Sequence, residues 1–213
     1  MLLIEKSLKD YIDQVASGEP TPGGGSVSAL AGSLGAALTV MVGNLTIGRK
    51  IYIELDDETK KEIDSAFEEI KKSIQVLNNI VDEDTKAFDK VMHALKLPKE
   101  TDEQKAIRSQ AIQEGYKVAL EVPLRCAEEC FKVLKLQKVF AEYGNVNAIT
   151  DVGVGVLLAA TGIEGAIFNV RINLNSIKDV EFKEKIENKI NSIMNEGMRL
   201  KEELLKIVYN RLG

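Results

Sequence analysis

Asp84 is the residue whose surroundings most suggest acid–base chemistry. A pattern typical of the buried side of a helix runs from residue 63 to residue 95, spaced alternately four and three residues apart. Its members are Ile63, Phe67, Ile70, Ile74, Leu77, Val81, Asp84, Phe88, Val91 and Leu95, and Asp84 is the one that is not apolar. A carboxyl group among apolar side chains acquires a partner or a raised pKa, and a perturbed carboxyl group can move protons in a ligand pocket. The alternative is a structural polar residue that fixes the register of the helix.

Asn169 and Asn173 end a second helical pattern one turn apart. The members before them are small, namely Gly155, Ala159, Gly162 and Ala166, and residues 28–39 carry a matching strip of Ser28, Gly32, Gly35 and Thr39. Small residues let two helix backbones approach closely, which accounts for the strips but not for the amides. Buried amides need partners, and their donors and acceptors suit the edge of a heteroaromatic ring. Capping near a helix end is the alternative.

Asp151 follows the turn that begins at Gly144. We expect Gly144 to end one helix and Asp151, or Thr150, to be the N-cap of the next. A carboxylate at the start of a glycine-rich helix is also well placed to meet a ligand. Asp151 precedes Asn169 by 18 residues, or about 27 Å along a helix, so one chain cannot bring both to one small ring. Either a long ligand spans the two, or a neighbouring subunit supplies one of them.

Gly23, Gly24 and Gly25 open a stretch in which residues 21–48 carry no charged side chain. Successive glycines are costly to order, and a chain accepts that cost where its backbone must approach something closely. We expect Ser26 to be the N-cap of the following helix, so that free N–H groups face whatever the loop encloses. The spacing fits neither a phosphate-binding loop nor a dinucleotide fingerprint. A plain hinge is the alternative.

The elements that must position these residues are predicted to be helices. Repeated 3–4 spacing of apolar residues and only four prolines indicate an all-α chain, a multi-helix bundle forming one domain over residues 1–213. The expected helices cover about 7–17, 26–47, 57–95, 101–144 with a kink near Pro123, 151–177, and 179 to the C-terminus. The first is expected to bury one face, formed by Leu8, Tyr11, Ile12 and Val15.

Composition excludes several classes of function. A net charge of −5 with 28 basic residues spread along the chain argues against nucleic acid as a partner. The uncharged run 21–48 is long enough to span a membrane, but its many small and polar residues and the mean hydropathy of −0.08 favour a core helix and no membrane partner. Without a signal-peptide pattern we expect a cytoplasmic protein, with Cys126 and Cys130 as reduced thiols. His93 is the sole histidine, which argues against a histidine-rich metal site.

The sequence resembles the cyclodeaminase domain of the formiminotransferase-cyclodeaminase family and its stand-alone bacterial relatives, some of which are methenyltetrahydrofolate cyclohydrolases. The run PGGGSVSALAGSLGAAL is followed in family order by VDEDTKAF (81–88), LKLPK (95–99), EG (114–115), VPL (122–124), GN (144–145), TD (150–151) and FNVRINL (168–174). The resemblance covers about residues 8–212. Thr150 stands where serine is expected, and Arg49 and Lys50 lead into IYIE rather than a more basic stretch, which bears on contacts with a polyglutamate tail.

The resemblance implies an all-helical homodimer that acts on a one-carbon tetrahydrofolate derivative, with or without a polyglutamate tail. The main expectation is closure of 5-formiminotetrahydrofolate to 5,10-methenyltetrahydrofolate and ammonia; the alternative is a cyclohydrolase that yields 10-formyltetrahydrofolate. Both reactions pass through a tetrahedral carbon between two folate nitrogens and need a proton donor and acceptor. No metal and no cofactor beyond the tetrahydrofolate substrate are expected.

On the matching positions, the resemblance makes Asp84 and Asp151 catalytic. The expected substrate-binding residues are Gly23, Gly24, Gly25, Ser26, Asp82, Lys99, Asn145, Asn169 and Asn173. Asp82 is a difficult member of this set, because it lies about 200° from Asp84 around a regular helix, and a surface ion pair with Lys86 is its simpler interpretation. Two other classes remain open: a helical scaffold without a pocket at Asp84, and a pair of membrane helices.

Overall fold

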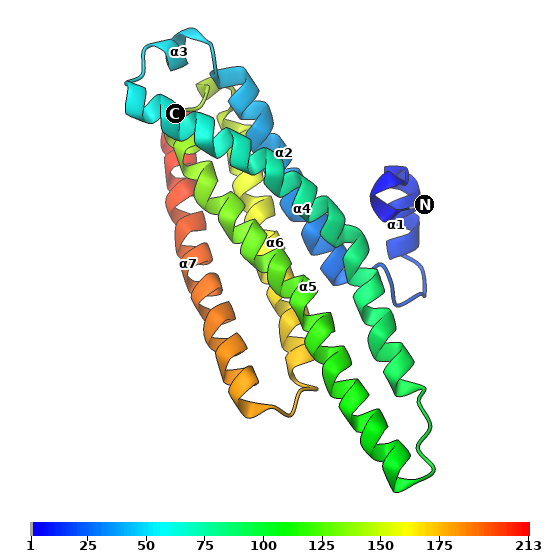
Figure 1. Cartoon of the computed structure of the whole chain (residues 1–213). Helices are drawn as coiled ribbons and strands as arrows, with labels where there is room; N and C mark the ends of the chain where they lie inside the picture. Colours follow the sequence, from blue (N-terminus) through cyan, green and yellow to red (C-terminus); the bar gives the residue numbers. More distant parts are fainter. Residues whose placement is uncertain (1) are drawn as a thin grey trace.

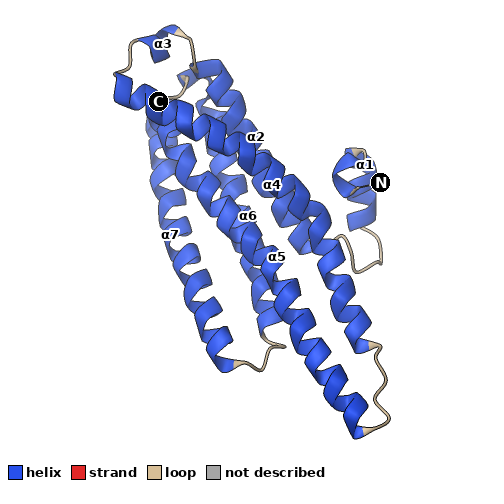
Figure 2. Ribbon diagram, viewed as in Figure 1, coloured by secondary structure: helices blue, strands red, loops and turns tan. Residues whose placement is uncertain are grey.

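The computed structural model describes residues 2–213, apart from the side chain of Phe88, and most of these residues are helical (Figure 1). Helices joined by loops, without a strand, make up this part of the chain (Figure 2). The α-helices are α1 (Leu8–Val15), α2 (Gly24–Thr46), α3 (Lys50–Ile53), α4 (Asp57–Leu95), α5 (Asp102–Tyr143), α6 (Ile149–Leu174) and α7 (Val180–Leu212), with 3₁₀ turns at Leu3–Glu5 and Val146–Ala148. The predicted all-α fold is confirmed.

Five long helices form the bundle, and the pair α2 and α6 packs most closely (Figure 1). The small strips explain this closeness: a Cβ added to Gly35 would lie 2.7 Å from the Gly155 carbonyl oxygen, and one added to Gly162 would lie 3.0 Å from that of Ser28. The strips therefore do allow backbone contact, as predicted. Helices α4 and α5 cover this pair, and α7 packs on α5 and α6.

Local capping signals define where three of the long helices begin. The Asp56 side chain accepts hydrogen bonds from the first turn of α4, including one of 2.9 Å from the Thr59 N–H. Thr101 and Gln104 form the predicted capping box of α5, and Asp179 caps α7. These caps satisfy N–H groups that have no partner within the helix. Because capping depends on residues only two or three positions apart, these helix starts could be predicted from the sequence.

Two predicted N-caps are wrong. Helix α2 begins at Gly24, with Gly23 as its N-cap, so Ser26 lies inside the first turn. Helix α6 begins at Ile149, with Ala148 as its N-cap, because the 3₁₀ turn 146–148 leads directly into it. Asp151 is therefore a first-turn residue of α6 rather than its cap.

Two predicted buried faces are only partly buried. In α1, Tyr11 is buried, whereas Leu8 and Ile12 are 72% and 61% exposed, because α1 stands off the bundle (Figure 1). In α4, the described members of the pattern from Ile63 to Val91 face the core or the cavity described below, but Leu95 at the helix end is 39% exposed. Phe88, which belongs to the same pattern, lies outside the described side chains.

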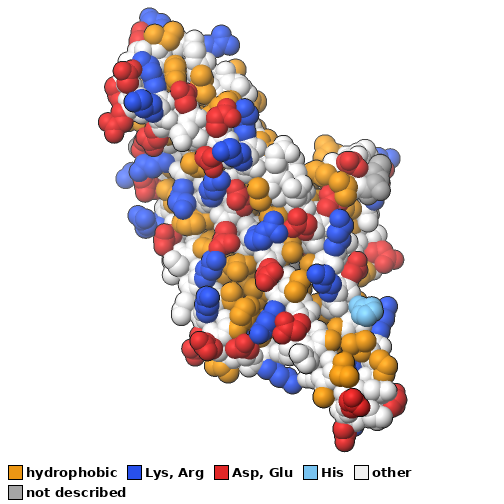
Figure 3. Space-filling view, viewed as in Figure 1, with side chains coloured by type: hydrophobic (Ala, Val, Ile, Leu, Met, Phe, Trp, Pro, Cys, Tyr) orange, Lys and Arg blue, Asp and Glu red, His pale blue; other side chains and the backbone are white. Residues whose placement is uncertain are grey.

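Basic and acidic side chains are intermixed on the face of the bundle seen in Figure 3. The helices α2 and α6, by contrast, are apolar enough and long enough to cross a membrane by those two criteria alone. In each, 56% of the most apolar window is buried inside the bundle, as in a core helix of a helical protein. The close packing of α2 on α6 accounts for much of that burial.

Candidate functional site

A cavity of about 480 Å³ lies where α2 begins and α6 ends, a volume in the range that binds small molecules. It is enclosed by the glycine loop, α4, α5 and the end of α6. Its lining residues are Pro20, Thr21, Gly23, Gly24, Gly25, Asp84, Ala87, Tyr116, Ala119, Asn169, Ile172, Asn173, Asn175 and Ser176. The structure thus brings together the three glycines, the carboxyl group and the two amides that the sequence had singled out.

Asp84 is the one carboxyl group that lines this cavity, and it faces the start of α2. Burial raises the pKa of Asp84, while a hydrogen bond from the backbone N–H of Ser26 acts in the opposite direction. The Asp84 carboxyl group can lie this close to the first turn of α2 only because residue 25 is glycine, since a Cβ there would lie 2.5 Å from Asp84 Cγ. Glycine at this position lets a half-buried carboxyl group reach the N-terminus of a helix, where a negative charge is stabilised.

The two amides are held by their own helix. Asn169 Nδ2 donates to the Gly165 carbonyl at 2.8 Å, and Asn173 Nδ2 donates to the Asn169 carbonyl at 2.9 Å. Each amide therefore keeps a carbonyl oxygen and a second N–H for a ligand. Asn169 also lies beside the glycine loop, because a Cβ on Gly24 would be 3.4 Å from its Nδ2.

Ser26 does not line the cavity, although the sequence predicted that it binds substrate. Its side chain is fully buried, and its Oγ donates to the Val81 carbonyl at 2.9 Å and lies 3.0 Å from Tyr11 Oη. Only the Ser26 backbone N–H is directed at Asp84. The Ser26 side chain therefore lies outside the cavity of this chain, and a substrate contact through it stays a prediction.

Asp82 also lies outside the cavity. Its carboxylate accepts hydrogen bonds from the backbone N–H groups of Leu3 at 2.6 Å and Ile4 at 3.4 Å, so it caps the N-terminal 3₁₀ turn. It is 9% exposed, and the predicted surface pair with Lys86 is therefore wrong. The angular separation from Asp84 expected from helix geometry explains this placement.

Asn145 and Asp151 lie at the opposite end of α2 and α6. The Asn145 backbone N–H donates to Thr46 Oγ1 at 2.9 Å, and its side chain donates to the Leu45 carbonyl at 3.0 Å, so this residue ties the α5–α6 turn to the end of α2. Asp151 is half-buried in the first turn of α6. Neither residue lines the cavity of its own chain.

Lys99 is exposed in the loop between α4 and α5, beyond the end of α4. It does not line the cavity either. The substrate contacts predicted for Lys99, Asn145 and Asp82 are thus absent from the cavity within a single chain.

Tyr116 is the principal lining residue that the sequence reasoning missed. It follows the EG motif at 114–115, where α5 packs against α4: a Cβ on Gly115 would make an ordinary contact, 3.5 Å from Val91 Cα. That motif was the signal in the sequence that could have pointed to Tyr116.

Gln113, one turn before Lys117 on the same helix, was also missed. Its Nε2 donates to the Ser176 carbonyl at 3.0 Å, and its Oε1 accepts from the Lys178 N–H at 2.7 Å.

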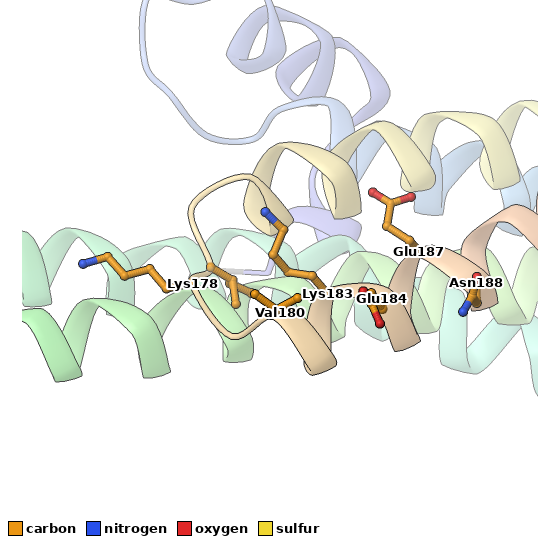
Figure 4. A pocket seen from close by; sticks show the side chains of 7 residues that line it. Lys178, Val180, Lys183, Glu184, Glu187 and Asn188 are labelled. Carbon is orange, nitrogen blue, oxygen red and sulfur yellow. The ribbon is translucent and has the colours of Figure 1, made fainter.

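A second hollow, of about 710 Å³, lies on the outer side of the α6–α7 turn (Figure 4). Its lining residues are Ile177, Lys178, Val180, Lys183, Glu184, Glu187 and Asn188. It is larger than the cavity at Asp84, but its surface is open and it mixes lysines with glutamates. The enclosed site with a carboxyl group of raised pKa is the better candidate for chemistry.

No group of three or more His, Cys, Asp or Glu side chains that could hold a metal ion occurs among the described residues. The polar groups of the cavity are instead one carboxyl group, the amides of Asn169, Asn173 and Asn175, the hydroxyl groups of Thr21, Tyr116 and Ser176, and the backbone of the glycine loop. This set is suited to binding an organic ring through hydrogen bonds and to transferring protons.

Comparison with known proteins adds to this geometry. The chain is 39% identical over 208 residues to a methenyltetrahydrofolate cyclohydrolase of Methylorubrum extorquens, covering 98% of both chains. It is 38% identical over 195 residues to the formimidoyltransferase-cyclodeaminase of Mus musculus, covering 92% of this chain but 35% of that protein. A formiminotetrahydrofolate cyclodeaminase from Thermotoga maritima has the same fold, with a TM-score of 0.78 and 27% identity over 98% of this chain and 96% of that chain.

The family model described as formiminotransferase-cyclodeaminase matches residues 7–192, a span that includes the glycine loop, Asp84 and both amides. The resemblance drawn from the sequence motifs is thereby confirmed. The chain belongs to the formiminotransferase-cyclodeaminase family.

Proposed function

We propose that this protein is a one-carbon folate enzyme that closes 5-formiminotetrahydrofolate to 5,10-methenyltetrahydrofolate and releases ammonia. The observation that carries the proposal is Asp84, a half-buried carboxyl group of raised pKa in a cavity that it shares with two amides and a glycine loop. The names of the Thermotoga maritima and Mus musculus relatives support the choice of reaction.

The proposed reaction needs proton transfer at two nitrogens. N10 of the folate attacks the carbon of the protonated formimino group, and a tetrahedral carbon forms between N5 and N10. The N10 proton must then leave, the departing amine must gain a proton, and the C–N bond breaks with its electron pair on ammonia. Asp84 serves as the carrier, accepting the first proton as a carboxylate and delivering the second as a carboxylic acid. Both steps use only the substrate and side chains.

The remaining cavity groups hold the ring in this scheme. Asn169 and Asn173 each offer a carbonyl oxygen and an N–H, which matches the alternating donors and acceptors along a pterin edge. Tyr116 supplies an aromatic wall, and Gly24 gives backbone access beside Asn169. Orientation by such groups lowers the entropic cost of bringing N10 onto the formimino carbon.

A cyclohydrolase is the second candidate, favoured by the match to the Methylorubrum extorquens enzyme over 98% of both chains. In that reaction water adds to the methenyl carbon, the bond from this carbon to N5 breaks, and 10-formyltetrahydrofolate results. The water must lose both of its protons to become the formyl oxygen; N5 gains one and the other is released to solvent. Asp84 can therefore carry a proton to the leaving nitrogen in both reactions.

A spectrophotometric assay of methenyltetrahydrofolate distinguishes the two. Absorbance that rises from formiminotetrahydrofolate identifies the cyclodeaminase, and absorbance that falls from methenyltetrahydrofolate faster than the uncatalysed rate identifies the cyclohydrolase. Asp84→Asn should keep its fold and lose roughly 10²- to 10⁴-fold in rate, as removal of an acid–base group does. If neither substrate turns over, or if Asp84→Asn keeps its rate and only its thermal stability changes, the proposal is wrong.

We also propose that the complete site is shared across a two-fold homodimer. Large apolar side chains are exposed along α2 and α6 from one end to the other: Val27, Leu34, Met41, Val154, Leu157, Phe168 and Ile172. Because Asp151 and Asn169 are about 27 Å apart on α6, antiparallel pairing of this face would place the partner subunit's Asp151 beside Asn169. A symmetric dimer would then hold two such sites.

Mixing inactive variants tests the shared site. Asp151→Ala and Asn173→Ala chains should complement each other, since a mixed dimer contains one site with both wild-type residues. Random exchange would restore about a quarter of wild-type activity, because half of the dimers are mixed and each holds one intact site of two. Asn169→Ala mixed with Asn173→Ala is the control and should stay inactive. No recovery in a mixture with confirmed subunit exchange contradicts the shared site.

A further inference from the structure

A pair of buried hydroxyl groups lies directly behind Asp84. Tyr11 Oη is 3.0 Å from Ser26 Oγ, and Ser26 Oγ donates to the Val81 carbonyl at 2.9 Å. A serine hydroxyl has one hydrogen, and here Val81 receives it, so the Tyr11 phenol must be the donor to Ser26. The hydrogen bonds therefore run in one direction, from α1 through the first turn of α2 to the backbone of α4.

Ser26 contacts α4 in two ways. Its hydroxyl bonds to the Val81 carbonyl, and the turn that contains it lies against the Asp84 carboxyl group, since a Cβ on the neighbouring Gly25 would be 2.5 Å from Asp84 Cγ. The Ser26 backbone N–H is the group that acts to lower the pKa of Asp84. The serine side chain thus fixes the position of the N–H that Asp84 uses. Gly25 beside it leaves no side chain that could hold this turn in place.

Tyr11 is the residue through which α1 joins this network. It is the buried residue of α1, at 7% exposure, whereas its neighbours Leu8 and Ile12 point to solvent. The segment before α1 is held separately, by Asp82, which accepts from Leu3 and Ile4. The phenol therefore contributes one directed hydrogen bond at a point close to Asp84, rather than a large part of the core.

We propose that Tyr11 is a positioning residue that acts through Ser26 to hold the first turn of α2 against the Asp84 carboxyl group. This inference rests on the proposed role of Asp84 as the proton carrier. Without the phenol, the Ser26 hydroxyl loses its donor, and of these two side-chain bonds only the one to the Val81 carbonyl still holds the first turn of α2. The ionised form of Asp84 then loses stabilisation, and its carboxyl group is less well placed for both proton transfers.

Few charged groups surround Asp84. On α4, Asp82 is engaged with the N-terminal turn, and Glu83 pairs with Arg125 of α5 at 2.9 Å. From α5 the cavity receives the Tyr116 phenol, and from α6 and the residues just after it three amides and the Ser176 hydroxyl, without a charged side chain. Helix α2 has no charged side chain either. The nearby Tyr11 phenol has its own pKa raised, first by burial and further by Asp84 and Asp82, so it stays a neutral donor. A change in the titration of Asp84 can thus be traced to the hydrogen bond from Ser26.

The test compares Tyr11→Phe and Ser26→Ala with wild type by two independent measurements. The first is a carbon-13 NMR titration of the Asp84 carboxyl group in the substrate-free protein, in which both variants should raise the titration midpoint. The second is the pH profile of kcat, in which the limb assigned to Asp84 should move to higher pH. The kcat should fall by about 3- to 10-fold, the value of one neutral hydrogen bond, with KM little changed.

Tyr52→Phe is the matched control, since Tyr52 donates to Asp64 at 2.8 Å far along α4 and should change neither measurement. The double variant Tyr11→Phe/Ser26→Ala should be no worse than the more impaired single variant, because both act through one chain of hydrogen bonds. Folded variants with an unshifted Asp84 titration and unchanged kcat overturn the inference. If Asp84→Asn is fully active, the proposed function has failed instead. The NMR titration of Asp84 in wild type, Tyr11→Phe and Ser26→Ala would still show whether Tyr11 positions the carboxyl group.

Discussion

Replacing Gly25 with alanine tests whether the glycine loop exists to admit Asp84. A Cβ at this position would lie 2.5 Å from Asp84 Cγ and 2.6 Å from Oδ2, whereas carbon atoms in contact are normally about 3.5–4.0 Å apart. The carboxyl group must therefore retreat by about 1 Å, or the first turn of α2 must move by a similar amount. Either shift separates Asp84 from the Ser26 N–H.

A displacement of about 1 Å in a catalytic group can cost 10²-fold in rate, or about 2.7 kcal/mol of transition-state stabilisation. We expect kcat/KM of Gly25→Ala to fall by about that factor. The fold should persist, because alanine is favoured over glycine inside a helix by about 1 kcal/mol, which offsets part of the crowding. The measurements are the methenyltetrahydrofolate assay and thermal unfolding of the same preparations.

Gly18→Ala is the control, since no atom lies within 4 Å of a Cβ at Gly18. It should keep wild-type kinetics. A sharper test repeats Gly25→Ala in an Asp84→Ala background, where the crowded carboxyl group is gone and the second substitution should cost no further activity. A folded Gly25→Ala protein with wild-type kcat/KM would refute the reasoning, because it would show that the close approach of loop and carboxyl group is not used.

Three further changes probe the same cavity. Gly24→Val should raise the dissociation constant of tetrahydrofolate about tenfold with helix content unchanged. A Cβ at this position would lie 3.4 Å from Asn169, so the larger valine side chain overpacks the site, at a cost of roughly 1–3 kcal/mol. An unaltered dissociation constant would mean that the glycine loop is only a hinge. Burial raises the pKa of Asp84 above 3.8, so as pH rises Asp84 ionises in the unfolded chain before it does in the folded protein, and wild type loses stability as the pH rises from 3.8 through the folded-state pKa. Asp84→Asn should therefore be the more stable protein at neutral pH. A difference in melting temperature that persists below pH 3.8 would argue against this cause. Gln113→Ala removes two hydrogen bonds, at 3.0 and 2.7 Å, that hold the α6–α7 turn. At about 1 kcal/mol per bond it should raise KM by up to about 30-fold. Exposed Gln110→Ala is the control, and equal KM values would contradict the role.

The features that could be predicted from the sequence are those set by neighbours within a few residues. The bounds of α4 agree with the prediction because Asp56 caps one end and Pro98 lies just beyond the other. The placement of Asp84 on the inner side of that helix followed from its spacing alone. The cavity at Asp84 then argues against the pure scaffold, which required that no pocket be present there.

The features that could not be predicted depend on partners far along the chain. Gly25 must be glycine because of a carboxyl group 59 residues away, and no local pattern records that requirement. Tyr116 reaches the cavity because α5 approaches α4 at Gly115, which depends on how two helices pack. Amphipathic spacing in α1 predicted a buried face of several residues, but the helix stands off the bundle and only Tyr11 is buried.

Ser26 shows why a correct local preference can give a wrong position. Serine is a favoured N-cap because its hydroxyl can accept from the backbone two or three residues later. Here the hydroxyl has better partners, Tyr11 and the Val81 carbonyl, which lie 15 and 55 residues away, and the helix begins two residues earlier at Gly24. That earlier start directs the Ser26 N–H to Asp84 instead of leaving it at the helix end. The failed N-cap prediction and the positioned carboxyl group therefore have one cause, which is the demand of a buried hydroxyl group for partners.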